Sequence, residues 1–278
     1  MNLEQDNLKQ TPINAKKVFK KLGTCSKTFF YILNREFGFP KELEERAADP
    51  LAGGIMKQGR QCGMLWGATL AVGAESFRRC ETQAQAIAMA ITATQQLVDS
   101  FLQTAKNVNC RELIHADLTT KWGMIKLLLL KSRSCLNLTE KWAPEAIKAA
   151  RKGLSIEKID YPEQPLNCAS EVAKRMGASE KEIVTVAGLA GGLGLSGGGC
   201  GALGAAVWLK TLDWCRKNPG KSAFENPDAD RTLKTFLAAT DSEILCHKLA
   251  GQRFNSINEH TEFIKNGGCE KLIDGLAN

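Results

Sequence analysis

Cysteines are the residues of this sequence with the clearest capacity for chemistry, and eight of the ten fall into two parallel sets. Successive members are 37, 48 and 25 residues apart in the first set and 32, 46 and 23 in the second. Thiolate is both the nucleophilic and the metal-binding form of cysteine, so the repeated order indicates thiol redox chemistry or metal binding. The first set comprises Cys25, Cys62, Cys110 and Cys135, and the second comprises Cys168, Cys200, Cys246 and Cys269.

A glycine-rich stretch precedes the second cysteine of each set. Ala-Gly-Gly stands at 52–54 and again at 190–192, and its last glycine lies eight residues before a Cys-Gly pair. We predict a tight turn that delivers Cys62 and Cys200 to the start of a helix. Consecutive glycine N–H groups beside Cys200 form a candidate anion-binding concavity. A Walker-type phosphate loop is not matched, because its lysine and hydroxyl residue are missing. The glycines assigned to shaping the turn, as candidate binding residues, are Gly198, Gly199 and Gly201.

Most of the eight cysteines follow a residue that commonly caps a helix N-terminus, such as Thr24 before Cys25 or Asn167 before Cys168. We therefore expect these thiols to lie in first helical turns, where the helix dipole stabilises a thiolate. All eight are candidate catalytic residues that converge within their own set. Cys62 and Cys200 are predicted to be the activated thiolates.

The chain resembles the C-GCAxxG-C-C family, whose name describes this cysteine pattern. Residues 199–204, Gly-Cys-Gly-Ala-Leu-Gly, match the GCAxxG box with glycine in place of its alanine, and Cys168, Cys246 and Cys269 match the other cysteines. The first half resembles a degenerate copy, in which Gln61 replaces the leading glycine. The resemblance implies thiol redox activity in two tandem modules.

The composition favours an all-α fold, since alanine, leucine, lysine and glutamate dominate and only 6% of residues are aromatic. We predict two homologous helical modules packed together, at residues 1–155 and 156–278, with a linker over 153–165. A surface helix over 141–152 with Pro144 in its first turn, and a helix from Asp241, are also expected.

The net charge of +7 is mild, and the basic run at 16–21 alternates with apolar residues as a solvated helix face does. No nucleic-acid-binding motif accompanies it, so we expect no nucleic-acid partner. Residues 183–209 carry no charge, but nine of them are glycine, which predicts two buried helices joined by a turn rather than a membrane span. With no apolar signal segment at the N-terminus, we expect a cytoplasmic protein with an unidentified redox partner and no membrane contact.

Two alternatives to a thiol–disulfide redox protein remain open at this stage. Four thiolates per module could hold zinc or an iron–sulfur cluster, with Cys168, Cys200, Cys246 and Cys269 as the candidate ligands. A helical binding or scaffold protein with structural cysteines is the other alternative. Cys80 and Cys215 lie outside the two sets and are predicted to be structural.

Overall fold

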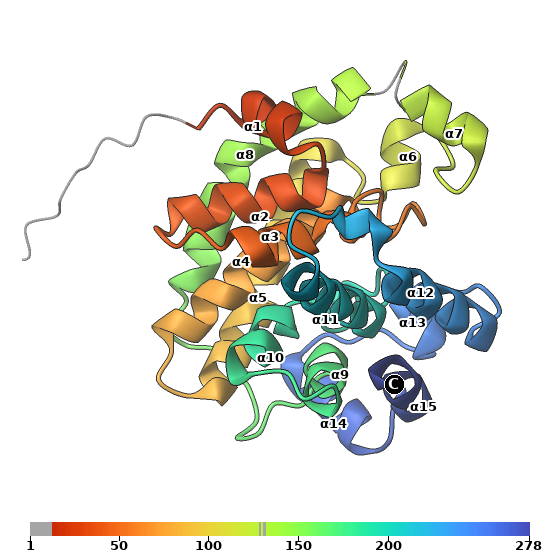
Figure 1. Ribbon diagram of the computed structural model, residues 1–278. Helices are drawn as coiled ribbons and strands as arrows, with labels where there is room; N and C mark the ends of the chain where they lie inside the picture. Colours follow the sequence, from red (N-terminus) through yellow and green to blue (C-terminus); the bar gives the residue numbers. More distant parts are fainter. Residues whose placement is uncertain (1–12, 128, 130–131) are drawn as a thin grey trace, which may run out of the picture.

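Helices occupy most of residues 13–127, 129 and 132–278, which the computed structural model describes (Figure 1). Within these ranges the only β-structure is two isolated bridges, Gln61 with Asn109 and Gly199 with Leu245. The predicted all-α fold is therefore confirmed. No helix in the described part of the chain is both long and apolar enough to cross a bilayer.

The first half, residues 13–154, surrounds the long helix α4. Its N-terminal helix α1 starts after Asn14, whose side chain accepts the Lys17 N–H, and ends at Gly23 in the left-handed region (φ 83°). The elements in order are α1 (Ala15–Leu22), α2 (Cys25–Glu36), α3 (Glu42–Ala47), the 3-10 helix η1 (Asp49–Leu51), α4 (Gly63–Arg79), α5 (Gln83–Ala105), α6 (Cys110–Ile114), α7 (Lys121–Lys126) and α8 (Ser132–Leu154).

The second half, residues 168–278, surrounds α11, which has 17 residues like α4. Ser179 and Glu182 form a reciprocal capping box at the start of α10. The elements are α9 (Cys168–Arg175), α10 (Glu180–Ala187), α11 (Gly201–Lys217), the 3-10 helix η3 (Ala223–Glu225), α12 (Pro227–Ala239), α13 (Cys246–Leu249), α14 (Ile257–Lys265) and α15 (Glu270–Ala277). The predicted pair of buried helices joined by a glycine turn over 183–209 is confirmed by α10 and α11.

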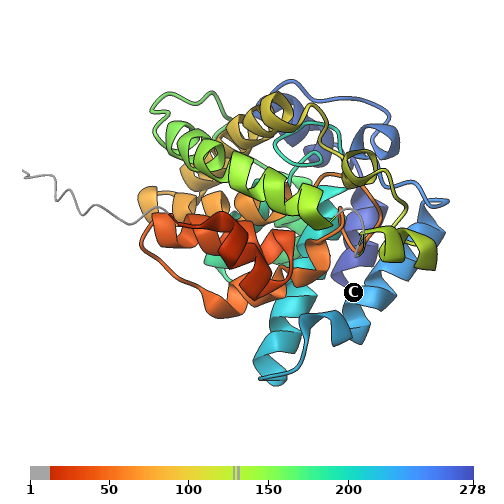
Figure 2. The same ribbon diagram turned by 90° about the horizontal axis from the view of Figure 1, so that it is seen from above.

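Each half packs against the central helix of the other half. Figure 1 and Figure 2 place residues 13–154 mainly on one side of the molecule and residues 168–278 on the other. Helix α4 packs against α2 and α5 of its own half and against α10 of the second half, while α11 packs against α9, α12 and α3. The contact between α4 and α10 is close, since a Cβ on Gly73 would lie 2.2 Å from the Thr185 carbonyl oxygen. Each central helix is thus covered partly by the opposite half.

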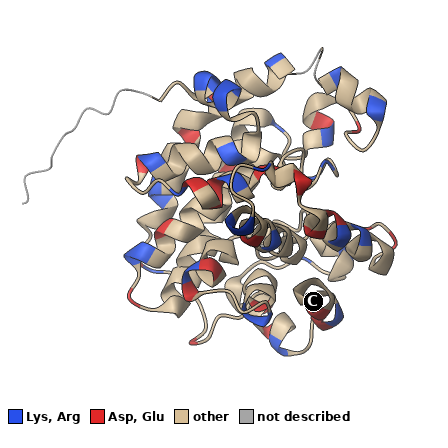
Figure 3. Ribbon diagram, in the orientation of Figure 1, with Lys and Arg blue, Asp and Glu red and all other residues tan. Residues whose placement is uncertain are grey.

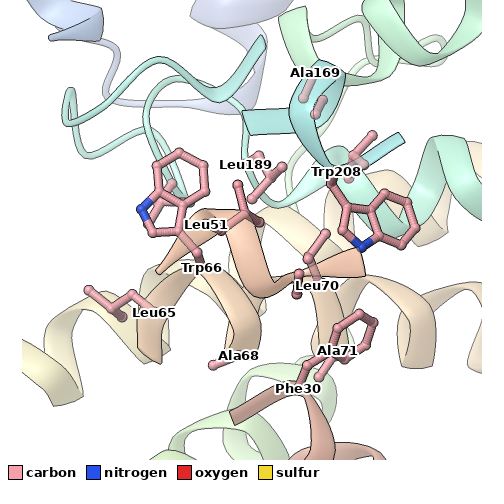
Figure 4. Packing of buried hydrophobic residues seen from close by; sticks show 14 of the residues in the cluster. Phe30, Leu51, Leu65, Trp66, Ala68, Leu70, Ala71, Ala169, Leu189 and Trp208 are labelled. Carbon is pink, nitrogen blue, oxygen red and sulfur yellow. The ribbon is translucent and has the colours of Figure 1, made fainter. Parts of the chain in front are cut away.

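One hydrophobic core runs through both halves. The indole of Trp66 is fully buried and that of Trp208 is 1% exposed. Figure 4 shows these two tryptophans on either side of Leu51 and Leu189, which are also fully buried. Figure 3 shows charged positions distributed over the helices of both halves, including the C-terminal part of α11. The start of each central helix is therefore held between apolar side chains of both halves.

Two predicted helices were placed wrongly. Helix α8 begins at Ser132 rather than Lys141, so Pro144 lies inside it and not in its first turn. Thr139 and Trp142, which precede the proline, are fully buried, and their burial favours helix across that position despite the lost backbone hydrogen bond. No helix starts at Asp241, because Asp241 and Ser242 both adopt positive φ and turn the chain toward α13. The apolar segment around 124–130 lies partly outside the described residues.

Candidate thiol site

The sulfur of Cys25 lies at the N-terminus of α4. Cys25 is the first residue of α2 and is partly exposed. A Cβ added to Gly63, the first residue of α4, would lie 2.5 Å from the Cys25 Sγ, so only glycine leaves room for this contact. Backbone N–H groups of Gly53 and Ser26 donate to the sulfur. The positive ends of two helices therefore face one sulfur atom.

Cys62 is the hydrogen-bond partner of Cys25. It is the N-cap residue of α4 and is 7% exposed. The hydrogen bond from the Cys62 thiol, together with the backbone donors, lowers the pKa of Cys25 below its ordinary value. The same hydrogen bond, with burial, raises the pKa of Cys62 well above its ordinary value. Of the two, Cys25 is therefore the thiol that loses its proton more readily, and Cys62 is the hydrogen-bond donor.

Cys110 and Cys135 complete the first set. Cys110 starts α6 and is 6% exposed, while Cys135 lies near the start of α8 and is partly exposed. Burial raises the pKa of both thiols, that of Cys135 to about 12, and the negative charge of Cys25 adds to the effect in each. The two thiols therefore lie within electrostatic reach of Cys25 and are themselves protonated at neutral pH.

The second set is brought together in the same way but is more deeply buried. Cys168 starts α9, Cys200 is the N-cap residue of α11, Cys246 starts α13 and Cys269 precedes α15. Burial raises the pKa of Cys168 to about 11 and that of Cys200 to about 12. Burial also raises the pKa of Cys246 and Cys269, and Cys246 interacts electrostatically with the other three members.

The pKa directions favour Cys25 over the two cysteines that were predicted to be activated. Cys62 and Cys200 were expected to be thiolates because each opens a long helix. Cys62 instead donates its proton toward Cys25, and Cys200 is buried, so the pKa of each is raised. Only Cys25 has a lowered pKa among the described cysteines for which a shift is resolved.

Both glycine-rich turns are short left-handed coils. Residues 53–57 and 191–195 each have five successive positive φ values, between 47° and 77°. Non-glycine residues such as Ile55 and Leu193 each cost about 1 kcal/mol in this conformation. Strain of this kind persists only where the surrounding structure imposes it, and it is frequent at functional sites.

Most backbone hydrogen bonds of the first turn have a counterpart in the second. The Gly59 N–H donates to the Gly53 carbonyl and the Gly197 N–H to the Gly191 carbonyl, both at 2.9 Å. The second and third cysteines of each set are linked equivalently. Cys62 N–H donates to Val108 and Cys200 N–H to Ile244, while Cys110 N–H donates to Arg60 and Cys246 N–H to Gly198, at distances of 2.5–2.8 Å.

Gln61 is a residue whose role was missed in the sequence. Its buried side chain crosses into the second half, where Nε2 donates to the Gly192 carbonyl at 2.7 Å and to the Ser196 hydroxyl at 3.2 Å. Its Oε1 accepts the Gly199 N–H at 2.5 Å. The amide of Gln61 thus occupies the candidate anion-binding concavity beside Cys200. The sequence contained one sign of this role, because Gln61 stands where the family motif has its leading glycine.

The three glycines of the second turn are needed for close contacts. A Cβ on Gly198 would lie 1.6 Å from Gln61 Nε2, and a Cβ on Gly201 would lie 1.8 Å from the Leu189 carbonyl oxygen. The Gly199 N–H is bonded to Gln61. Among the residues that the structure describes, no three His, Cys, Asp or Glu side chains are grouped so that they could hold a metal ion. The two free cysteines outside the sets, Cys80 and Cys215, lie at the end of α4 and inside α11.

A comparison with protein-family models places the first cysteine set in a known family. The match extends over residues 24–148 and contains Cys25, Cys62, Cys110 and Cys135. This segment matches the C-GCAxxG-C-C family. The family is described as "Putative redox-active protein (C_GCAxxG_C_C)". The matched C-GCAxxG-C-C segment is the half predicted to be the degenerate copy, so the match does not support the prediction that the second half is nearer to the family. No curated protein and no solved structure matches the chain.

The hydrogen bond inside the C-GCAxxG-C-C segment predicts a specific pH dependence. Alkylation of Cys25 by iodoacetamide follows its thiolate fraction, so the rate is expected to persist to lower pH than for an ordinary cysteine. Cys62→Ala removes the donor that contributes most to the lowered pKa of Cys25. The rate profile of this variant should shift to higher pH, with slower alkylation at pH 7. Cys62→Ser keeps a hydroxyl donor and serves as the control. Peptide mapping follows the alkylation of Cys25 in each variant. Identical rate profiles for the two variants would contradict the hydrogen bond from Cys62 to Cys25 as the cause of the lowered pKa.

Proposed function

We propose that this chain is a thiol–disulfide redox protein in which Cys25 and Cys62 are the exchange pair. The hydrogen bond from the buried Cys62 thiol to the sulfur of Cys25, a residue that is partly exposed, carries this proposal. A lowered pKa and partial exposure suit Cys25 to attack a disulfide. Cys62 lies in contact with Cys25 but is hidden from substrate, which suits the second, resolving step.

The reaction balances as a two-electron reduction of a substrate disulfide. The Cys25 thiolate attacks one sulfur of the substrate, forms a mixed disulfide and releases the other sulfur as a thiolate. Cys62 then loses its proton to the released thiolate and attacks the Cys25 sulfur, which frees the second substrate sulfur as a thiolate that takes a proton from water. The products are a Cys25–Cys62 disulfide and two substrate thiols. A cellular dithiol or low-molecular-weight thiol would return the protein to its reduced form.

We further propose that the two halves are homologous modules produced by duplication. The corresponding hydrogen bonds of the two turns and the equal lengths of α4 and α11 support this. The raised pKa values of the second set make that module the slower one in exchange. A cytoplasmic location is part of this proposal, because a reducing compartment keeps cysteines available for thiol exchange.

Disulfide mapping tests the exchange pair. The protein is equilibrated in glutathione buffers between about −150 and −300 mV, free thiols are alkylated, and peptides are identified by mass spectrometry. Cys25 and Cys62 should become protected together, in one two-electron step, as a single disulfide-linked peptide pair. A thiol count that stays unchanged over this range would refute the proposed function. Protection of Cys25 with a cysteine other than Cys62 would refute the pairing alone.

A further inference from the structure

An apolar groove opens on the surface of α7 next to the first cysteine set. Its volume is about 520 Å³. Trp122, Ile125 and Leu129 line it and are 79%, 44% and 76% exposed, three of the six large hydrophobic side chains that are exposed in the described chain. Exposed apolar side chains that are grouped in this way indicate an interaction surface.

The groove is continuous with the cysteine cluster beneath it. Ala116 lines the groove and belongs to a small hydrophobic cluster that also contains Cys110. Met124 of α7 and Cys135 of α8 pack against the same cluster. Cys110 and Cys135 both interact electrostatically with Cys25. The hydrophobic cluster that lines the groove therefore contains Cys110 and contacts Cys135, two members of the same cysteine set as the exchange pair.

The surroundings of the groove are basic. Helix α7 carries Lys121 and Lys126 and no carboxylate, and Lys126 lines the groove. The segment 110–120 before this helix contains two carboxylates, Glu112 and Asp117. One of the carboxylates, Asp117, is paired with Arg111 at 3.0 Å. Figure 3 shows further basic positions on α1 and α8 along the same edge of the molecule. Charge complementarity therefore selects an acidic partner.

We propose that this groove docks the substrate of the exchange reaction, a protein whose accessible disulfide is flanked by apolar and acidic side chains. The proposal rests on the proposed function. A protein segment fits better than a lipid surface, because α7 has only six residues and the apolar side chains line a concave groove rather than one face of a long amphipathic helix.

Three disulfides of defined chemistry test the docking site on the full chain. Two are peptides with one cysteine between two leucines, flanked by glutamates in one and by lysines in the other, each joined to 5-thio-2-nitrobenzoate. The third is 5,5′-dithiobis(2-nitrobenzoate) itself, which has no peptide segment that could lie along the groove. Release of the coloured thiolate gives the rate in each case. The acidic peptide should react about tenfold faster than the basic one.

Variants separate docking from chemistry. Trp122→Ser should remove most of the preference for the acidic peptide and leave the rate with the small disulfide unchanged. The matched control is Phe39→Ser, since Phe39 is 43% exposed just beyond the C-terminal end of α2, whereas Cys25 starts that helix.

Each remaining outcome has a defined meaning. Equal rates for the two peptides, or an equal loss with all three disulfides in Trp122→Ser, would overturn the docking proposal while the exchange reaction stands. No reaction of the unmodified chain with any of them would overturn the proposed function itself. If the chain binds phosphatidylglycerol vesicles through Trp122 and reacts equally with the two peptides, the partner is a membrane surface instead.

Discussion

Replacing Cys25 by serine is expected to slow the reaction of the reduced protein with a small disulfide by at least about 100-fold. Cys25 is the described cysteine with a lowered pKa and is partly exposed, whereas the buried thiols around it are protonated at neutral pH. Stopped-flow measurement with excess 5,5′-dithiobis(2-nitrobenzoate) under anaerobic conditions gives the rate of the fast phase.

The second half offers a matched control for this prediction. Cys168 occupies the corresponding place, at the start of α9, and also accepts a hydrogen bond from the turn glycine Gly191. Because its pKa is raised to about 11, only about one molecule in ten thousand carries the thiolate at pH 7. Cys168→Ser should therefore leave the fast phase unchanged. A larger effect of Cys168→Ser than of Cys25→Ser would show that the second half is the active one.

Gly201→Ala is expected to destabilise the fold by about 3 kcal/mol. Gly201 is the first residue of α11, and the added Cβ would lie 1.8 Å from the Leu189 carbonyl oxygen. That oxygen belongs to the backbone and accepts the Leu193 N–H, so it cannot move away as a flexible side chain would. Helix α11 must therefore move away from the turn that contains Leu189. This movement also disturbs the contact between Trp66 and Gly204 of α11. Thermal and urea unfolding measure the loss.

Gly275→Ala is the control for that substitution. Gly275 lies inside α15, and nothing is within 4 Å of the position its Cβ would take. Alanine has the higher helix propensity, so this variant should be unchanged or more stable by up to about 1 kcal/mol. Equal effects of the two substitutions would mean that the close approach of α11 to Leu189 does not limit stability.

The sequence by itself was sufficient for the properties that depend on neighbouring residues. Glycine spacing and the apolar run over 183–209 predicted two buried helices joined by a turn, which the structure shows as α10 and α11. The order of the cysteines predicted the redox family, which the comparison supports for residues 24–148. The glycine spacing predicted a turn before Cys62 and Cys200. These features are local, because capping and turn formation involve residues only a few positions apart.

The tertiary structure decided how acidic each cysteine is, because acidity depends on donors and burial that residues distant in sequence provide. The pKa of Cys25 is lowered by a hydrogen bond from Cys62, which lies 37 positions away in the sequence. Gln61 is placed against Gly192, 131 positions away, and this contact could not be read from its neighbours. The packing of α10 against α4 and of α3 against α11, like the groove over α7, depends on the assembly of the helices. Side chains far apart in the chain meet only once the core has formed.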